Sequence, residues 1–265
     1  DEFEQYNNLI FLLAWKIYWP HEHCSILHKK LSVNGGKNGI TYGYPATENL
    51  AFNRNVFPES RWRVQPTLVK KIIFAPHHTI EESKYSLSSF LKFGEFIKSL
   101  AKAYQGKIQW SFKPHPILKS KLYLHPYWGK QKTDAYYNFW KDESYTQLDE
   151  GDYDDLFLTS DAIIHDCSSF IVEYAFTGKP CLYLLNDNNL DDLLNEFGAG
   201  VMQVYEQAKT IDEIKIFADN VIREAIMLDK VKRRYFDNYV ETYYKDKSPS
   251  ERIINNLIQS IGALQ

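Results

Sequence analysis

Hydrophobic positions in the middle of the chain follow a strand, helix, strand order. An apolar run at residues 72–74 comes first, and apolar residues then recur at helical spacing over residues 87–100. Residues 108–112 alternate between apolar and polar side chains, as a half-buried strand does. A strand, a crossover helix and a second strand make one parallel unit.

The same pattern recurs further along the chain. Three more strands and two helices are predicted, at residues 162–164, 180–185 and 201–204 and at residues 170–176 and 190–197. Two long helical stretches follow, residues 211–228 and 250–264, joined by a charged and aromatic segment at residues 230–247. This alternation predicts an α/β fold, a Rossmann-like parallel sheet with helices on both faces.

The start of the chain has a different pattern. Residues 1–19 are compatible with a helix, and a polar stretch with two glycines at residues 35–37 then breaks regular structure. We therefore divide the chain into a lead-in helix and linker, residues 1–60, and a Rossmann-like domain with C-terminal helices, residues 61–265. Because the chain starts at Asp1 and not at Met, we expect a fragment of a longer protein.

Composition narrows the class of protein. With 44% hydrophobic and 25% charged residues the chain is an ordinary globular one, and its formal net charge of -3 argues against a nucleic-acid binder held by bulk charge. Three cysteines are an odd number that fits reduced thiols. The apolar stretch at residues 9–15 is far shorter than the roughly 20 residues that cross a bilayer. We expect a cytoplasmic protein, or one attached to a membrane surface.

Three loops that follow predicted strands carry unusual polar side chains, at residues 75–79, 113–116 and 165–169. Parallel strands bring such loops to one edge of the sheet, where ligands bind. In the third loop, the N–H groups of a helix start and the hydroxyls of Ser168 and Ser169 would form an anion site. The alternative is that Asp166 or Ser168 only caps the helix.

The first two loops supply histidines. His115 lies between two prolines, which hold the imidazole in one direction, as phosphate binding or proton transfer requires. The alternative is a structural histidine in a rigid turn. His77 and His78 are adjacent, so in an extended backbone they point to opposite sides and at most one faces the cleft. We favour His78.

Other motifs are weaker or missing. Cys24 and His28 would share a helical face, and with His21 and His23 they suggest a zinc site, but no second paired ligand motif accompanies them. We favour a solvated loop there and expect no metal. No Walker, G-x-G-x-x-G, G-x-S-x-G or H-E-x-x-H motif occurs, which excludes the common ATPase, dehydrogenase, hydrolase and metalloprotease classes.

A set of short motifs in a fixed order covers roughly residues 37–260. The motifs are Gly39-Ile40-Thr41 with Gly43-Tyr44-Pro45, Ile72-Ile73-Phe74-Ala75-Pro76, Phe112-Lys113-Pro114-His115-Pro116, residues 160–169, Glu173-Tyr174, Gly178-Lys179-Pro180 and Ser250-Glu251-Arg252. In this combination the chain resembles the CDP-glycerol glycerophosphotransferase family, which includes the teichoic acid glycerol-phosphate primases and polymerases.

The resemblance implies a two-lobed GT-B transferase, of which this chain is similar to the C-terminal lobe that binds the nucleotide donor. The N-terminal lobe of the family carries a His-Gly motif thought to supply the catalytic base. No His-Gly pair exists in this sequence. Either the chain is a fragment or it has lost that function. We favour a fragment, for which the N-terminal lobe is a missing partner.

Residue roles follow from the resemblance. It assigns His115, the candidate catalytic residue, to the diphosphate of the donor, and Ser168 and Ser169 to phosphate binding. Arg252 matches a family arginine that would neutralise phosphate with a planar fork of donors. The His77-His78 pair stands where the family usually has Thr-aromatic-Arg.

The remaining candidates are weaker. His78 is a further phosphate ligand, and Lys113, Asp166 and Glu173 are candidates for the nucleotide or polyol pocket. Cys167 stands where the family commonly has Tyr.

The implied activity is transfer of glycerol phosphate, or a related polyol phosphate, from a CDP-linked donor to a hydroxyl of a cell-surface polymer. CMP would leave, and no cofactor is expected. The implied partners are the nucleotide-linked donor and a polymer or lipid-linked acceptor, with no nucleic acid and with peripheral contact at the inner face of the membrane. The alternatives are a GT-B glycosyltransferase that uses a nucleotide sugar and a non-catalytic binding or membrane-docking module.

Overall fold

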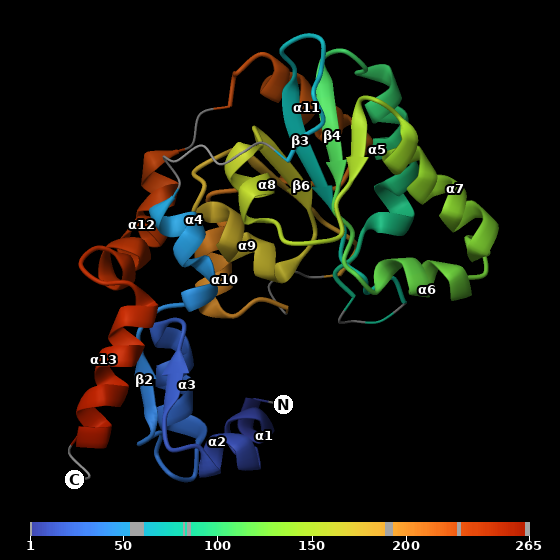
Figure 1. Cartoon of the computed structure of the whole chain (residues 1–265). Helices are drawn as coiled ribbons and strands as arrows, with labels where there is room; N and C mark the ends of the chain where they lie inside the picture. Colours follow the sequence, from blue (N-terminus) through green and yellow to red (C-terminus); the bar gives the residue numbers. More distant parts are fainter. Residues whose placement is uncertain are drawn as a thin grey trace. The chain divides into compact units, whose positions relative to one another are not determined.

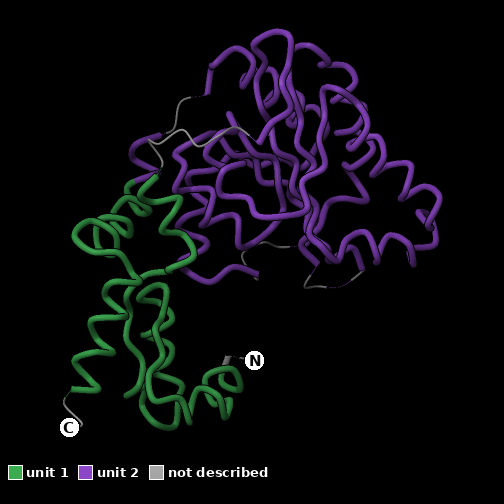
Figure 2. Tube along the Cα trace, in the orientation of Figure 1, with its two compact units in different colours: residues 1–53, 234–265 green, residues 54–233 purple. Residues whose placement is uncertain are grey.

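The computed structural model describes residues 2–53, 61–81, 83, 86–188, 193–226 and 229–262. The chain forms two compact units, coloured separately in Figure 2. Unit 1 combines residues 1–53 with residues 234–265, and unit 2 is residues 54–233. This differs from the predicted division at residue 60, because the C-terminal helices group with the start of the chain and not with the sheet.

Unit 2 is built on a six-stranded sheet in which every pair of neighbours is parallel, as predicted. Its strands are β3 (Lys70–Ala75), β4 (Ile108–Phe112), β5 (Thr146–Leu148), β6 (Ala162–His165), β7 (Cys181–Leu184) and β8 (Glu206–Ala208). Their order across the sheet is β5-β4-β3-β6-β7-β8. The chain therefore moves outward in one direction from β3 and in the other from β6, and the order reverses between these two strands.

Helices cover both faces of this sheet (Figure 1). They are α5 (Phe90–Ala103), α6 (Leu118–Leu124), α7 (Gly129–Asp142), α8 (Asp154–Thr159), α9 (Ser168–Ala175), α10 (Glu196–Met202), α11 (Ile211–Ile222) and the first residues of α12 (Lys230–Tyr244). Alternate strand residues such as Ile72 and Phe74 belong to the core beneath α5, α7 and α11. On the other face, His165 contacts Phe170 of α9.

Aromatic residues fill much of the core of unit 2. The ring of Phe112 lies 5.5 Å from Tyr136, 5.2 Å from Tyr137 and 5.2 Å from Trp140, measured between centroids. All four side chains are buried. The pairs of Phe112 with Tyr136 and Tyr137 are edge-to-face and the pair with Trp140 is stacked, and both arrangements add to the free energy gained from burial alone. Part of the high aromatic content of the chain therefore serves this core.

Several predicted elements of unit 2 differ from the observed ones. Residues 201–204 are not a strand, since Val201 and Met202 are buried on the last turn of α10, and β8 begins only at Glu206. The segment at residues 230–247 is mostly the helix α12. Strand β5 and helices α6 and α7 were not predicted. The first part of the helix predicted at residues 190–197 lies outside the described residues.

Unit 1 contains a parallel pair of short strands, β1 (Ile17–Trp19) and β2 (Gly39–Thr41). Its helices are α1 (Glu2–Tyr6), α2 (Leu9–Leu13), α3 (Glu22–Leu31), a 3-10 turn (Pro45–Thr47), α4 (Glu48–Phe52), the rest of α12, and α13 (Pro249–Gly262). The prediction of one helix over residues 1–19 is wrong. Asn8 begins a second helix by accepting a bond from the Ile10 N–H, and β1 follows.

The Gly43-Tyr44-Pro45 motif has a structural role within unit 1. Gly43 has a φ of 93°, and a Cβ there would lie 2.8 Å from Cγ of Pro249, so only glycine fits without a shift. The Tyr44 N–H donates to the Tyr244 hydroxyl at 3.0 Å, and Thr47 Oγ1 lies 2.7 Å from the same oxygen. In the described part of the chain, no helix is both long and apolar enough to span a membrane.

Candidate functional site

The site is built where the strand order reverses, at the carboxyl ends of β3 and β6. Ligands of open parallel sheets bind at such a point, because the loops on its two sides run apart and leave a crevice. The loop after β3 carries His77 and His78, and the loop after β6 carries Asp166. The predicted meeting of post-strand loops at one edge is confirmed for this pair by the bonds of Asp166.

Asp166 ties the two loops together. Its Oδ1 accepts a hydrogen bond from the His77 N–H at 2.5 Å, and its Oδ2 accepts from the Ser89 N–H at 2.6 Å and the Ser89 hydroxyl at 2.9 Å. The side chain is fully buried, and burial raises the pKa of this carboxyl to about 6 against the opposing effect of these bonds. Asp166 is therefore a positioning residue beneath the loops.

The alternative that Asp166 or Ser168 caps helix α9 is wrong. The N-cap residue is Cys167, whose side chain makes no capping bond. Its thiol lies 3.5 Å from the Ala75 carbonyl and is buried, and burial raises the pKa of the thiol. Ser168 and Ser169 form the first turn of α9 and are exposed, as residues that meet a phosphate must be. Their phosphate role stays a prediction.

The loop after β4 lies against the loop after β3. The Lys113 N–H donates to the Phe74 carbonyl at 2.8 Å, and the His115 N–H donates to the Pro76 carbonyl at 3.0 Å. These two backbone bonds continue the register of the strand pair beyond its end. The backbone of His115 is thereby held beside the first loop. That the two prolines hold its imidazole in one direction stays a prediction.

Three imidazoles meet at this place, and we call them the histidine cluster: His77, His78 and His115. Ring centroids lie 4.4 Å apart for His77 and His78, 4.1 Å for His78 and His115, and 5.3 Å for His77 and His115. The prediction that at most one of the adjacent histidines faces the site is wrong. The chain bends at His78 after leaving β3, so the alternation of an extended strand does not apply.

Electrostatics favour neutral imidazoles in the cluster. Burial, then the neighbouring imidazoles and Lys121, lower the pKa of His77 to about 4. Burial and Lys121 also lower the pKa of His78, and burial and His78 lower that of His115. Lys121 of α6 forms an ion pair with Glu81 at 2.5 Å. Neutral imidazoles can donate one N–H each to an anion or offer a lone pair to a metal.

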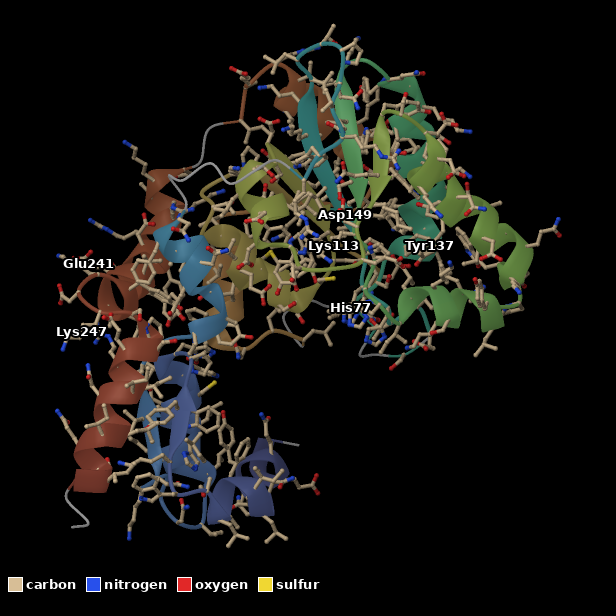
Figure 3. The ribbon with its side chains drawn as sticks, viewed as in Figure 1. His77, Lys113, Tyr137, Asp149, Glu241 and Lys247 are labelled. Carbon is tan, nitrogen blue, oxygen red and sulfur yellow. The ribbon has the colours of Figure 1, made fainter. Side chains whose placement is uncertain are left out.

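Two weaker candidates, Lys113 and Glu173, form a second group through Tyr153. The Lys113 ammonium donates to the Gly151 carbonyl at 2.6 Å and lies 5.3 Å from the centre of the Tyr153 ring. The Tyr153 hydroxyl donates to Glu173 at 2.7 Å. Burial lowers the pKa of Lys113 and raises that of Glu173. Figure 3 labels Lys113 and Asp149 close to the carboxyl ends of the strands, with His77 beyond them.

Arg252 belongs to the other unit. It lies on α13, where its Nε donates to the Lys247 carbonyl at 3.2 Å and its Nη2 to the Thr242 carbonyl at 3.4 Å. These are bonds within unit 1, and the proposed contact of Arg252 with phosphate stays a prediction.

The prediction of a solvated loop around Cys24 is wrong, because Cys24 and His28 lie on helix α3. His28 is buried there and its Nδ1 accepts from Trp19 Nε1 at 3.2 Å, while Cys24 Sγ lies 3.5 Å from His21 Nε2. Among the described residues, the one group of three side chains placed to hold a metal ion is the histidine cluster.

Sequence reasoning missed two members of the site. It set His77 aside because it assumed an extended backbone, and it did not consider Lys121. The signal for Lys121 was its position one helical turn into α6, directly after the His115 loop. From this position the Lys121 cation lowers the pKa of all three histidines of the cluster.

Comparison with known proteins agrees with this architecture. A structure of a variant of the wall teichoic acid polymerase TagF soaked with CDPG matches with a TM-score of 0.53 and 17% identity, over 97% of this chain and 59% of that one. A second TagF structure matches with a TM-score of 0.54 and 16% identity, over 97% and 60%. The UDP-GlcNAc 2-epimerase of Methanocaldococcus jannaschii, in complex with UDP-GlcNAc and UDP, matches with a TM-score of 0.55 and 12% identity, over 95% and 63%.

These similarities establish a GT-B-like fold, and this chain spans about three fifths of each of the two TagF chains. No curated protein sequence matches the chain. The model of the family described as CDP-glycerol:poly(glycerophosphate) glycerophosphotransferase matches residues 27–259, which is most of the chain. The chain therefore belongs to the CDP-glycerol:poly(glycerophosphate) glycerophosphotransferase family.

Proposed function

We propose that this chain binds the CDP-linked donor of a glycerol-phosphate transferase at the carboxyl edge of its six-stranded sheet. In the complete enzyme, glycerol phosphate or a related polyol phosphate would pass to a hydroxyl of a cell-surface polymer, with release of CMP. The observation that carries the proposal is the histidine cluster at the reversal of strand order, in a chain that belongs to this family.

For this reaction, the carboxyl edge of the sheet must bind the diphosphate of the donor. The acceptor oxygen would attack the phosphorus next to the glycerol, and the bond from that phosphorus to the oxygen of CMP would break. Negative charge spreads over the phosphoryl oxygens in such a transition state, so fixed N–H and O–H donors stabilise it by their placement.

His115 is the best placed donor. Its Nδ1 accepts from the Ile117 N–H at 3.2 Å, so in the neutral ring the proton lies on Nε2 and can be donated to a phosphate oxygen. Ser168, Ser169 and the N–H groups of the first turn of α9 would supply further donors from the neighbouring loop. The general base for the acceptor hydroxyl would come from the N-terminal lobe that the family resemblance implies.

The same proposal indicates where the acceptor would bind. A polymer or lipid-linked acceptor would meet the donor between the two lobes, in the cytoplasm and at the inner face of the membrane.

Equilibrium binding tests the proposal. Calorimetric titration of the chain with CDP-glycerol, CDP, CMP, UDP-GlcNAc and GDP should give the tightest binding with the CDP compounds. His115→Ala should weaken CDP-glycerol binding by roughly tenfold or more, because a hydrogen bond to a charged group is lost.

His125→Ala is the matched control, since His125 ends helix α6 outside the cluster. It should bind CDP-glycerol like the unchanged chain. Preference for UDP-GlcNAc would move the assignment to a nucleotide-sugar enzyme of the same fold. A folded chain that binds no nucleotide would contradict the proposal.

A further inference from the structure

We propose that the histidine cluster is a binding site for one divalent transition-metal ion of the Zn²⁺ class, held by His77, His78 and His115. A fourth position would remain for an oxygen ligand. This inference concerns the metal alone and does not depend on which nucleotide the chain binds.

The spacing of the three rings fits a common metal ion. One nitrogen from each ring lies within 4.8 Å of the others. In a tetrahedral site with metal–nitrogen distances of about 2 Å, imidazole centroids are ~5 Å apart. The observed 5.3 Å between His77 and His115 already has this value, and His78, at 4.4 Å and 4.1 Å from the other two, needs only a small outward shift.

The surroundings hold the ligands in place. The His77 backbone is fixed by Asp166, and the His115 backbone by the Pro76 carbonyl. Nδ1 of His77 lies 2.9 Å from the Thr79 hydroxyl, an outer partner of the kind that orients a metal-binding imidazole through its second nitrogen.

His78 supplies an independent observation. Its Nδ1 is buried and has no hydrogen-bond partner in the described structure. A buried polar atom without a partner costs free energy unless a ligand satisfies it. A metal ion bound to this nitrogen would remove that cost.

Two existing contacts must change. The Thr79 N–H donates to Nδ1 of His77 at 3.4 Å, and this bond would break if His77 bound the ion through Nε2 with a proton on Nδ1. The Ile117 N–H donates to Nδ1 of His115 at 3.2 Å, and coordination through Nε2 would place a proton on Nδ1 and break this bond. The Nε2 proton that the metal-free chain would donate to phosphate would then be absent, and the ion itself would meet the phosphate oxygen.

The nearby charges are balanced, because Lys121 is paired with Glu81. The positive charge of the ion therefore adds to a nearly neutral surrounding, and an anionic oxygen is the expected fourth ligand.

Cobalt titration tests the proposal. The chain is treated with chelator, dialysed, and titrated with Co²⁺ while visible absorption is recorded. We expect one equivalent to bind with the intense bands of a four-coordinate site, and Zn²⁺ to displace it. His77→Ala and His78→Ala should each weaken Co²⁺ binding at least tenfold, and His125→Ala should leave it unchanged.

Thermal unfolding of each variant without metal establishes that it is folded, and Zn²⁺ should raise the melting temperature of the unchanged chain but not that of His78→Ala. Binding of well under one equivalent, or binding that the cluster variants leave intact, would mean an adventitious ion only and would overturn the proposal. Equal loss in His125→Ala would overturn it as well.

Discussion

At the scale of single residues, buried groups determine where the exposed ones lie. Asp166 contacts no ligand in our account, yet it holds the backbone of His77 and the start of α5 at fixed positions. His165, directly before it, is fully buried between Tyr183 and Tyr205, and among the described residues neither of its ring nitrogens has a hydrogen-bond partner. The adjacent residues His165 and Asp166 therefore have different roles. Asp166 positions the loops of the site, and His165 affects the stability of the fold.

Asp166→Asn should lower both stability and donor affinity. The amide keeps one acceptor oxygen but turns an NH₂ group toward an N–H donor, so at least one buried donor loses its partner, at a cost of about 1–3 kcal/mol. Urea unfolding measures this loss. Ser89→Ala, which removes only the hydroxyl bond, should cost less, and an Asn variant as stable as the unchanged chain would contradict the assigned role.

His165→Phe should flatten the dependence of stability on pH. Burial lowers the pKa of His165 from 6.5 to about 3, so between these values the unfolded chain binds a proton that the folded chain does not. The free energy of unfolding therefore falls as the pH falls through this window, by up to about 1.4 kcal/mol per pH unit from this group. Urea unfolding at pH 4.5, 5.5 and 7 should give a smaller slope for the variant. Equal slopes would contradict the account.

Sequence patterns identified His115 and His78 because their neighbours carry conformational information: two prolines in one case, and the end of a buried strand in the other. The position of His77 depends on a bend at His78, and the bonds of Asp166 depend on Ser89, 77 residues away in the chain. A single sequence contains no signal for such a long-range pair. The role of Asp166 could therefore not be predicted.

At the scale of elements, helix starts carry the clearest local signals. Thr210 begins α11 with a capping box, in which its hydroxyl accepts from the Glu213 N–H and Glu213 accepts from the Thr210 N–H. The apolar face of α11, with Ile214, Phe217 and Val221 buried, belongs to the core of unit 2. Its start and its buried face are therefore both encoded locally.

Thr210→Ala should destabilise unit 2 by about 1 kcal/mol, because one N–H at the start of α11 loses its partner. Thr210→Ser, which keeps the hydroxyl, should recover most of the loss. Thermal or urea unfolding distinguishes the two variants. Equal stability of all three chains would mean that the box contributes nothing.

Secondary-structure elements were predicted wrongly or missed where the local hydrophobic pattern does not match the burial of the residues in the fold. Val201 and Met202 were predicted to lie in a strand. A short run of apolar residues occurs both in a buried turn of helix and in a buried strand, so the sequence pattern does not distinguish the two. Strand β5 is only three residues long, and its residues Thr146 and Gln147 are polar although buried. Their side chains bond to backbone or side-chain groups nearby, which the sequence does not reveal.

At the scale of the whole of unit 2, the sheet has two edges with different uses. At the amino edge lies a cavity of about 870 Å³ whose lining includes Lys70, Lys107 and Lys179. The Lys179 ammonium, however, donates to the carbonyls of Leu158 and Ser160 at 2.5 and 2.6 Å and so satisfies backbone acceptors at the C-terminal end of α8. The size of that cavity does not make it the donor site, since the topology and the histidine cluster favour the carboxyl edge.

Hydrogen–deuterium exchange with and without CDP-glycerol tests this central claim most directly. The account predicts slower exchange at residues 76–79, 113–117 and 166–169, the three loops of the carboxyl edge, and unchanged exchange at residues 68–71 and 158–161 around the amino-edge cavity. In His115→Ala at the same ligand concentration the protection should largely disappear. Protection confined to residues 68–71 and 158–161 would contradict the account.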